Sequence, residues 1–264
     1  MPNPSQRRKP AHGSGPPLLL RPRTVSTSGR STAIASDVSV LDARFMTDER
    51  RRHWDDAYAK GVADVSWYQA EPRMSLHMLD SVGVDPSASV VDVGGGASPL
   101  VDVLVQRGFG DVTVVDLSTV AVEAAQARLG ADATDVRWCI DDVLGWRPGR
   151  RFDVWHDRAV FHFLTDDVSQ QRYVDTLTAV TDERSLIVLA TFAPSGPQTC
   201  SGLPVARYDA AGLGKHLGDA WTLVRSTSED HLTPWGTVQP FTWAAFRRSL
   251  RDTRVDQGED VGPG

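Results

Sequence analysis

Short apolar runs alternate with amphipathic segments between residues 89 and 192. Five runs rich in Val, Ile, Leu and aromatic residues have the length and composition of buried strands, and they lie at 89–93, 111–117, 135–140, 152–157 and 184–192. Segments with helical spacing lie between them at 99–106, 118–130 and 169–181. Buried strands that alternate with amphipathic helices are typical of a parallel sheet with right-handed crossovers. The pattern therefore predicts an α/β fold.

The rhythm changes after residue 192. A loop rich in Gly and Pro at 193–204 precedes a short helix near 210–217. Two further strand candidates, 221–230 and 239–249, are separated by a segment at 231–238 that is typical of a hairpin connection. We therefore expect an antiparallel pair of strands at the C-terminal end of the sheet.

A helical region precedes the first strand. Thr47 is a suitable N-cap for a helix that carries Trp54 and Tyr58 and ends at Gly61. After a loop, a second helix is expected over 72–83.

The two ends of the chain differ from the middle in composition. Residues 1–36 carry six basic side chains and no acidic one, among many Pro, Ser, Gly and Thr residues. Such a segment buries too little apolar surface to offset the entropy lost on ordering. A solvated tail, a transit-type peptide and an upstream translation artefact remain open, because Met46 is also a suitable start. The predicted parts are a disordered basic tail at 1–40, one domain at 41–250 that includes a helical lid at 41–83, and a flexible tail at 251–264.

Composition narrows the class of protein and its partners. The chain has 264 residues, of which 41% are hydrophobic and 23% charged, and its net charge of −6 argues against nucleic acid as a partner. Its two cysteines, Cys139 and Cys200, lie far apart without metal-ligand spacing, which excludes a disulfide framework or a zinc ribbon. No apolar run approaches the roughly 20 residues of a membrane helix. We expect a cytoplasmic protein with no metal site, and its oligomeric state stays open.

Three consecutive glycines follow the first strand, in the stretch "SVVDVGGGAS" from Ser89 to Ser98. Glycine permits a tight turn with positive φ and a close backbone approach, and such a turn directs backbone N–H groups above the sheet. Gly94, Gly95 and Gly96 therefore predict either a bound ligand or a strand-to-helix turn that serves packing alone.

Carboxylates at the ends of the next two strands favour a nucleoside ligand. Asp116 ends the second strand, 22 residues after Gly94, where a carboxylate accepts hydrogen bonds from ribose hydroxyls. Asp141 and Asp142 follow the third strand, where one carboxylate would accept the exocyclic amine of adenine and the Val143 amide would serve a ring nitrogen. The carboxyl ends of neighbouring parallel strands meet in one crevice.

The glycine pattern discriminates between cofactors. A dinucleotide fingerprint would place its third glycine at position 99, which is Pro99, whereas the chain reads D-x-G-x-G-x-S from Asp92 to Ser98. This resembles motif I of class I S-adenosylmethionine-dependent methyltransferases, with serine in place of the last glycine. The resemblance covers most of 54–248 and extends to the thiopurine-like small-molecule branch, whose N-terminal lid is similar to "WDDAY" and "VSWYQ". A group of eukaryotic lysine methyltransferases has a similar start.

The resemblance implies a fold and a cofactor. The implied fold is a Rossmann-like, mostly parallel seven-stranded sheet with helices on both faces, in which the seventh strand lies between the fifth and sixth. The implied cofactor is S-adenosylmethionine. The residues expected to bind it are Asp92, Gly94, Gly95, Gly96, Ser98, Asp116, Leu117, Asp141, Asp142, Val143, Asp157, Trp54 and Trp67.

The segment "WHDRAVFHF" after the fourth strand carries the candidate catalytic groups. We expect Asp157 to be the polar residue nearest the reacting centre and His162 to be a base or a substrate contact, with a packing role for His162 as the alternative. Strand alternation points His156 away from Asp157. Arg158 would bind the cofactor carboxylate or pair with Asp157.

Two further segments have candidate contacts. Aromatic side chains of the N-terminal lid would close over a sulfonium cation, or else serve ordinary packing: Trp54, Tyr58, Trp67 and Tyr68, with Gln69 beside them. The loop after the fifth strand carries three residues that could contact an acceptor: Cys200, Arg207 and Tyr208. For Cys200, the alternative is a small buried side chain with no reactive role.

These features predict a methyltransferase that uses S-adenosylmethionine and acts by in-line displacement. The expected acceptor is a small molecule, with a protein lysine as another possibility, and whether it reacts through O, N or S stays open. The competing hypotheses are an NAD(P)- or nucleotide-sugar-binding Rossmann enzyme and a non-catalytic, cofactor-binding subunit with a methyltransferase fold.

Overall fold

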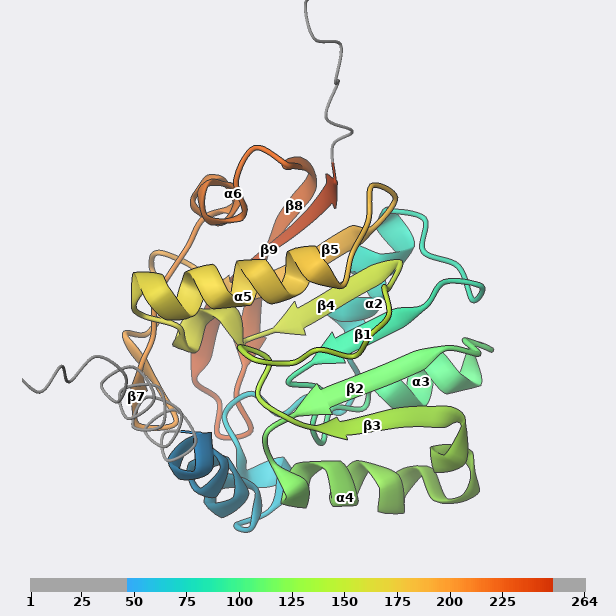
Figure 1. Cartoon of the computed structure of the whole chain (residues 1–264). Helices are drawn as coiled ribbons and strands as arrows, with labels where there is room; N and C mark the ends of the chain where they lie inside the picture. The colour runs from blue at the N-terminus through green and yellow to red at the C-terminus, as the bar shows by residue number, and fades with distance from the viewer. Residues whose placement is uncertain (1–46, 249–264) are drawn as a thin grey trace, which may run out of the picture. The chain divides into compact units, whose positions relative to one another are not determined.

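One mixed sheet organises the computed structural model, which describes residues 47–248. Its seven strands have the order β3-β2-β1-β4-β5-β9-β8 (Figure 1). The strands are β1 (Val90–Val93), β2 (Val112–Asp116), β3 (Val136–Ile140), β4 (Val154–Arg158), β5 (Leu186–Phe192), β8 (Trp221–Leu232) and β9 (Val238–Arg248). β9 pairs antiparallel with both β5 and β8, while β1 to β5 pair in parallel. The predicted seven-stranded sheet is confirmed, including the last strand between the fifth and sixth. The predicted tails at 1–40 and 251–264 lie outside the described residues.

The helices follow the predicted order. They comprise a helical segment at 47–58, then α2 (Arg73–Ser81), α3 (Leu100–Gln106), α4 (Thr119–Leu129), α5 (Asp167–Ala179) and α6 (Ala210–Leu217), with the short 3₁₀ turns η1 (Val62–Asp64), η2 (Gly130–Asp135) and η3 (Phe161–Phe163). Polar side chains cap three of the helices by accepting a hydrogen bond from the first helical turn: Ser118 at α4, Asp166 at α5 and Asp209 at α6.

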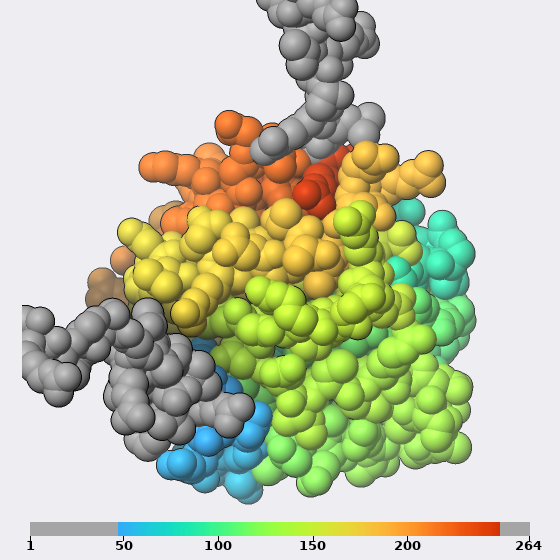
Figure 2. All heavy atoms as spheres, viewed as in Figure 1, coloured from blue at the N-terminus to red at the C-terminus, as the bar shows by residue number. Residues whose placement is uncertain are grey.

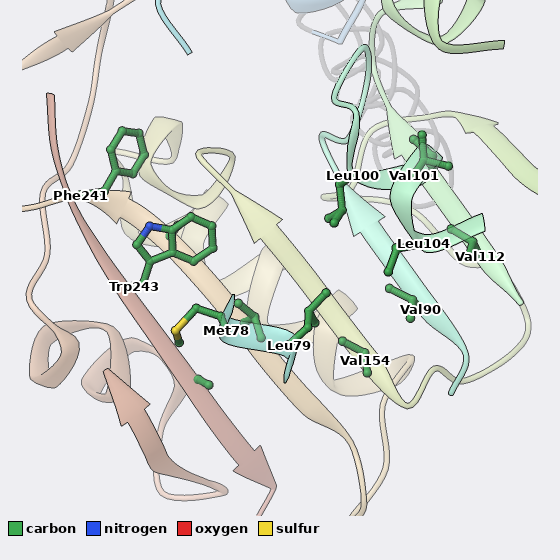
Figure 3. Packing of buried hydrophobic residues seen from close by; sticks show 14 of the residues in the cluster. Met78, Leu79, Val90, Leu100, Val101, Leu104, Val112, Val154, Phe241 and Trp243 are labelled. Atoms are coloured by element: carbon green, nitrogen blue, oxygen red, sulfur yellow. The ribbon is translucent and has the colours of Figure 1, made fainter. Parts of the chain in front are cut away.

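Each face of the sheet packs its own hydrophobic core. On one face, Met78 and Leu79 of α2 and Leu100 and Leu104 of α3 pack against inward-pointing valines of the strands (Figure 3). On the other face, α5 and α6 cover a second cluster that includes Trp155. Because successive side chains of a strand point to opposite faces, both faces of the central strands are apolar. The rigid sheet therefore holds the ends of its strands in fixed positions.

The connection from β3 to β4 contains no helix. Residues 141–153 instead run across the α5 face of the sheet, and Val143, Trp146 and Phe152 are buried in the core there. Trp146 and Phe152 stack with their ring centroids 5.7 Å apart. In Figure 2 this connection forms a yellow-green band directly below α5. It brings the residues after β3 over the carboxyl end of β2.

Two details of the C-terminal part differ from expectation. The β8–β9 connection is shorter than predicted, because the strands stay paired up to Leu232 and Val238. The expected loop at 193–204 contains a small hairpin of β6 (Thr199–Cys200) and β7 (Leu203–Pro204). Figure 1 shows that this hairpin and the helical segment at 47–58 lie at the end of the sheet toward which the parallel strands point. Within 47–248, no helix is long and apolar enough to cross a membrane.

Candidate active site

The glycine turn after β1 allows a very close approach of neighbouring groups. Gly94 has a φ of +65°, and a Cβ there would lie 2.1 Å from Val160 Cγ2. A Cβ at Gly95 would lie 2.5 Å from Asp92 Oδ2, and one at Gly96 would lie 2.6 Å from Asp116 Oδ2. Real Cβ atoms do not approach that closely, so the turn accommodates only glycine at these positions. It forms the floor of a crevice above the carboxyl ends of β1, β2 and β4.

Asp92 connects this floor to the interior. Its Oδ1 atom lies 2.7 Å from His156 Nδ1, and His156 Nε2 lies 3.0 Å from Ser75 Oγ. The Oδ2 atom of Asp92 is buried and has no hydrogen-bond partner among the described residues. Asp92 and Ser98 both line a hollow beside the glycine turn. An unpaired buried carboxylate oxygen is costly, and it suits a ligand that donates hydrogen bonds, such as an ammonium group.

Asp116 lies at the end of β2, where the sequence predicts a ribose contact. Its Oδ1 atom accepts a hydrogen bond from the Ser118 amide at 2.7 Å, which fixes the orientation of the carboxylate. Burial and the nearby carboxylates of Asp92 and Asp55 raise the pKa of Asp116 to about 7. Asp116 and Leu117 line the main cavity, and the Leu117 carbonyl also accepts a hydrogen bond from Arg51.

The residues after β3 close the far end of the cavity. Asp141, Asp142 and Val143 all line it. Asp141 Oδ1 accepts a hydrogen bond from the Asp142 amide, and Asp142 Oδ1 accepts one from the Leu144 amide at 3.0 Å. Asp142 Oδ2 accepts hydrogen bonds from Thr47 and Arg50 of the N-terminal helical segment. Asp142, one of the two carboxylates expected near an adenine amine, therefore also anchors this helix.

The N-terminal lid covers the crevice from above. Trp54 and Trp67 both line the main cavity, and their rings meet edge to face with centroids 5.8 Å apart. Trp67 Nε1 donates a hydrogen bond to the Tyr58 hydroxyl at 3.0 Å. Asp55 fastens the segment at 47–58 to the start of α4, because its Oδ1 atom accepts hydrogen bonds from Ser118 Oγ at 2.7 Å and from the first turn of α4.

Asp157 does not lie where the sequence analysis places it. Its carboxylate is fully buried and accepts hydrogen bonds from the amides of Val160 and Phe161 and from the Tyr173 hydroxyl. It lines neither hollow beside the glycine turn. The expectation that Asp157 faces the reacting centre is therefore wrong. The turn after β4 curls back over the strand end, so that this carboxylate caps the turn instead of a ligand.

His162 and Arg158 do reach the cavity. His162 is fully buried, lines the cavity and keeps its Nε2 atom unpaired among the described residues. Arg158 donates one hydrogen bond, from Nη1 to the Trp67 carbonyl at 2.9 Å, and the described residues show no pairing with Asp157. His156 points to the opposite face from Asp157, as strand alternation predicts.

Side chains at one end of β5 and β9, which the sequence analysis did not single out, complete the lining together with Cys200, which it did. Phe192 ends β5, and its partner in register, Phe241, lies near the start of β9 together with Gln239. The antiparallel insertion of β9 brings its first residues to the same edge as the parallel strand ends. Cys200 also lines the cavity. Tyr208 does not, because its hydroxyl accepts a hydrogen bond from Gln170. Arg207 binds backbone carbonyls of its own loop. No group of three or more metal-ligating side chains occurs in the part of the chain described.

A family model described as a methyltransferase domain matches residues 90–182. A curated relative, malonyl-[acyl-carrier protein] O-methyltransferase 1 from Ilyobacter polytropus, is 24% identical over 131 residues. That match covers 47% of this chain and 47% of the relative, so it spans about half the length of each.

Two solved structures show the fold. The N-methyltransferase NodS from Bradyrhizobium japonicum, in complex with S-adenosyl-L-homocysteine, has a TM-score of 0.58 and 18% identity, with 74% of this chain and 98% of that chain covered. A 1,6-didemethyltoxoflavin-N1-methyltransferase from Burkholderia thailandensis, with substrate and S-adenosylhomocysteine bound, has a TM-score of 0.54 and 19% identity, with 86% and 94% covered. The sheet order is that of these solved methyltransferase structures, and the glycine turn and Asp92 lie within the segment that the methyltransferase-domain model matches.

Proposed function

We propose that this protein transfers the methyl group of S-adenosylmethionine to a small-molecule nucleophile. The observation that carries the proposal is one continuous cavity with two chemically different ends. One end has Asp116, Asp142 and the glycine turn, which suit the ribose, adenine and methionine parts of the cofactor. The other end is lined by aromatic side chains, with Trp54, Phe163, Phe192 and Phe241 among them.

The enclosure of the second end favours a small acceptor over a protein side chain. Trp54 of the helical segment at 47–58 lines the cavity and packs edge to face on Phe163, with ring centroids 4.9 Å apart. Such a chamber excludes water and holds a compact, mostly apolar molecule. Support also comes from the names of the relatives, because the Burkholderia protein is named for N1-methylation of a toxoflavin precursor.

Positioning supplies much of the catalysis in this proposal. Methyl transfer is an in-line displacement at carbon, and the sulfonium is already an activated leaving group. The cofactor supplies the methyl group, and the chain's own residues hold the acceptor in line with it and keep water out. The aromatic faces of Trp54 and Trp67 also suit a sulfonium cation.

Binding and turnover measurements test the proposal against the two alternatives. Isothermal titration should show binding of S-adenosylhomocysteine and no binding of NAD. Incubation with S-adenosylmethionine carrying a labelled methyl group, in the presence of a small-metabolite extract, should then label a small product. Failure of a folded sample to bind S-adenosylhomocysteine would exclude the proposal, and cofactor binding with no labelled product from any extract would favour the non-catalytic subunit.

A further inference from the structure

We propose that the methyl acceptor is a carboxylic acid with an apolar body, which binds as its carboxylate to Arg158 and His162 and is methylated on oxygen. This inference rests on the proposed function, since it names the acceptor of that same site. It would settle which nucleophile, among oxygen, nitrogen and sulfur, the chain has evolved to use.

Arg158 presents two unused donors at the site. Its Nε and Nη2 atoms are buried and have no hydrogen-bond partner among the described residues. No carboxylate in 47–248 forms an ion pair with it. Glu229 lies within electrostatic range, but its two oxygens accept hydrogen bonds from Gln69 and Trp243. A buried guanidinium with two unpaired donors is costly, and these planar donors match a carboxylate.

His162 adds a third donor. The Phe192 amide donates a hydrogen bond to His162 Nδ1 at 3.3 Å, so Nδ1 acts as the acceptor and the ring proton lies on Nε2. Burial and the charge of Arg158 lower the pKa of His162 to about 3, so the ring stays neutral. The buried Nε2–H group has no partner among the described residues. In this proposal His162 acts as a hydrogen-bond donor toward the cavity and not as a base.

The two side chains flank the same aromatic ring. Arg158 Cζ lies 5.2 Å from the centre of the Phe241 ring, and the His162 ring centroid lies 6.5 Å from it. Phe241 lines the acceptor end of the cavity but not the hollow beside the glycine turn. Both side chains therefore lie beside the same ring of the cavity lining, where the surrounding aromatic rings would hold the apolar body of an acid.

At the aromatic end of the cavity, the described residues offer no ready base for a protonated nucleophile. Burial raises the pKa of the Cys200 thiol to about 11, and Asp157 lies outside the cavity. A carboxylate needs no base, because it is already ionised near neutral pH. One carboxylate oxygen forms a bond to the methyl carbon, the carbon–sulfur bond breaks, and its electron pair stays on sulfur. The products are a neutral methyl ester and S-adenosylhomocysteine, and no proton moves.

The main alternative ligand for Arg158 is the carboxylate of the cofactor's own methionine. Arg158 lines both the acceptor end and the hollow beside the glycine turn, so geometry allows either carboxylate to reach it. His162 lines the main cavity and not the hollow beside the glycine turn, which favours the acceptor carboxylate as the ligand that the two side chains share. The cofactor fragment 5′-methylthioadenosine lacks the amino-acid part and therefore the carboxylate. Its binding distinguishes a contact of Arg158 with the cofactor carboxylate from one with the acceptor carboxylate.

A binding comparison on the wild-type protein provides the first test. With the protein saturated with S-adenosylhomocysteine, isothermal titration should show phenylacetate binding at least about tenfold more tightly than phenylacetamide or phenethylamine, because only the acid pairs with a cation. Equal affinities for acid and amide, or no binding of the acid at millimolar concentration, would overturn the inference while leaving cofactor binding and the proposed function intact.

Variants identify which carboxylate Arg158 holds. Arg158→Gln should weaken phenylacetate binding by about tenfold or more and change the affinities for S-adenosylhomocysteine and 5′-methylthioadenosine by less than about threefold. His162→Phe, which keeps a flat ring but removes the donor, should weaken phenylacetate by several-fold. Arg107→Gln, at an exposed ion pair with Asp80, is the matched control. Loss of S-adenosylhomocysteine affinity alone, with phenylacetate and 5′-methylthioadenosine unaffected, would assign Arg158 to the cofactor.

The chemistry of the labelled product provides the last test and needs no variant. Labelled products made from a small-metabolite extract should release labelled methanol on mild alkaline hydrolysis, as methyl esters do. Labelled products that survive this treatment would show an amine, thiol or phenol acceptor, which would overturn this inference and uphold the proposed function. The absence of any labelled product would instead contradict the proposed function itself.

Discussion

A methyl group at Gly94 would lie 2.1 Å from Val160 Cγ2, and the backbone there has a φ of +65°. Gly108 has a similar φ of +85°, but a Cβ there would meet nothing within 4 Å. An alanine at either position would therefore have the conformational strain of a left-handed residue, and only an alanine at Gly94 would also clash with a neighbouring side chain.

Gly94→Ala should be much more damaging than Gly108→Ala. We expect both variants to lose about 1 kcal/mol of stability from backbone strain, and only Gly94→Ala to lose S-adenosylhomocysteine binding by about a hundredfold, because the turn must shift away from Val160. Urea unfolding and isothermal titration of both variants measure the two effects. Similar cofactor affinities in the two variants would mean that the turn is not part of the cofactor site.

We expect Asp116 to make cofactor affinity depend on pH. Burial raises its pKa to about 7, so the carboxyl group of the cofactor-free protein is mostly protonated below pH 7. Ribose hydroxyls donate hydrogen bonds to the ionised form, so binding must release the proton. The affinity for S-adenosylhomocysteine should fall by up to about tenfold per pH unit below pH 7. Titrations from pH 5 to 8 measure this dependence.

Two variants serve as controls for that dependence. Asp116→Asn should bind the cofactor weakly and lose the pH dependence. Asp111→Asn, at a surface carboxyl paired with Arg137 and Arg150, should keep the wild-type profile. A wild-type affinity that does not change between pH 5 and 8 would contradict the role of Asp116.

At the scale of elements, the segment at 47–58 acts as a fastened lid. Asp55 ties it to the start of α4, and Thr47 and Arg50 tie it to Asp142 beside the cavity. Trp54 and Tyr58 of this segment line the cavity, so the segment borders the proposed cofactor site. Local opening of such an element, without global unfolding, is the expected route of entry.

Asp55→Ala should loosen the lid. It removes the hydrogen bonds from Ser118 Oγ and the Val120 amide, so the segment should exchange its amide hydrogens about tenfold faster and the bound S-adenosylhomocysteine should dissociate faster. Hydrogen-exchange mass spectrometry and stopped-flow dissociation measure these rates. Asp56→Ala, next to it on the exposed side, is the control. Equal rates in the two variants would show that Asp55 does not hold the lid.

At the scale of the whole molecule, two buried groups give opposite dependences of stability on pH. Burial raises the pKa of Asp157 to about 6, so its contribution to stability is present below pH 4 and is lost as the pH rises through 6. Burial lowers the pKa of His162 to about 3, so its contribution is present above pH 6.5 and is lost as the pH falls toward 3.

Variants at these two positions should change the pH dependence of the free energy of unfolding in opposite directions between pH 4 and 6. Relative to wild type, the free energy of unfolding of Asp157→Asn should rise with pH, and that of His162→Gln should fall with pH, each by about 1.4 kcal/mol per pH unit. Urea unfolding at pH 4, 5 and 6 measures both slopes. Asp175→Asn, on the exposed side of α5, should follow wild type. Parallel curves for all proteins would refute the assignment of either group.

Most of the fold could be predicted from the chain because its signals are local. Strands and helices alternate at short range, and Ser118, Asp166 and Asp209 start helices through contacts within three residues. The resemblance then supplied the position of the last strand between the fifth and sixth, which the pattern alone does not contain. The β6–β7 hairpin was missed, because two-residue strands have no periodicity.

The candidate site could be predicted only in part. The cavity is lined by Gly94, Asp116, Asp142 and His162, all of which the sequence analysis singled out from strand ends. Phe241 and Gln239 were missed, since they meet the site through β9, which runs antiparallel to the others, and Phe192 was missed because it joins them only through the pairing of β5 with β9. Their position at the site follows from the register between β5 and β9, which no local sequence motif predicts.

The sequence by itself determined the order of the elements, the two apolar faces of the sheet and the glycine turn with its acidic partners, because each depends on neighbours in the chain. Only the tertiary structure decided the orientation of the groups after β4. Asp157 turns inward because Tyr173, 16 residues away, donates to it, and the tautomer of His162 is set by the Phe192 amide, 30 residues away. Arg158 and His162 are left with unused donors by contacts that packing alone creates.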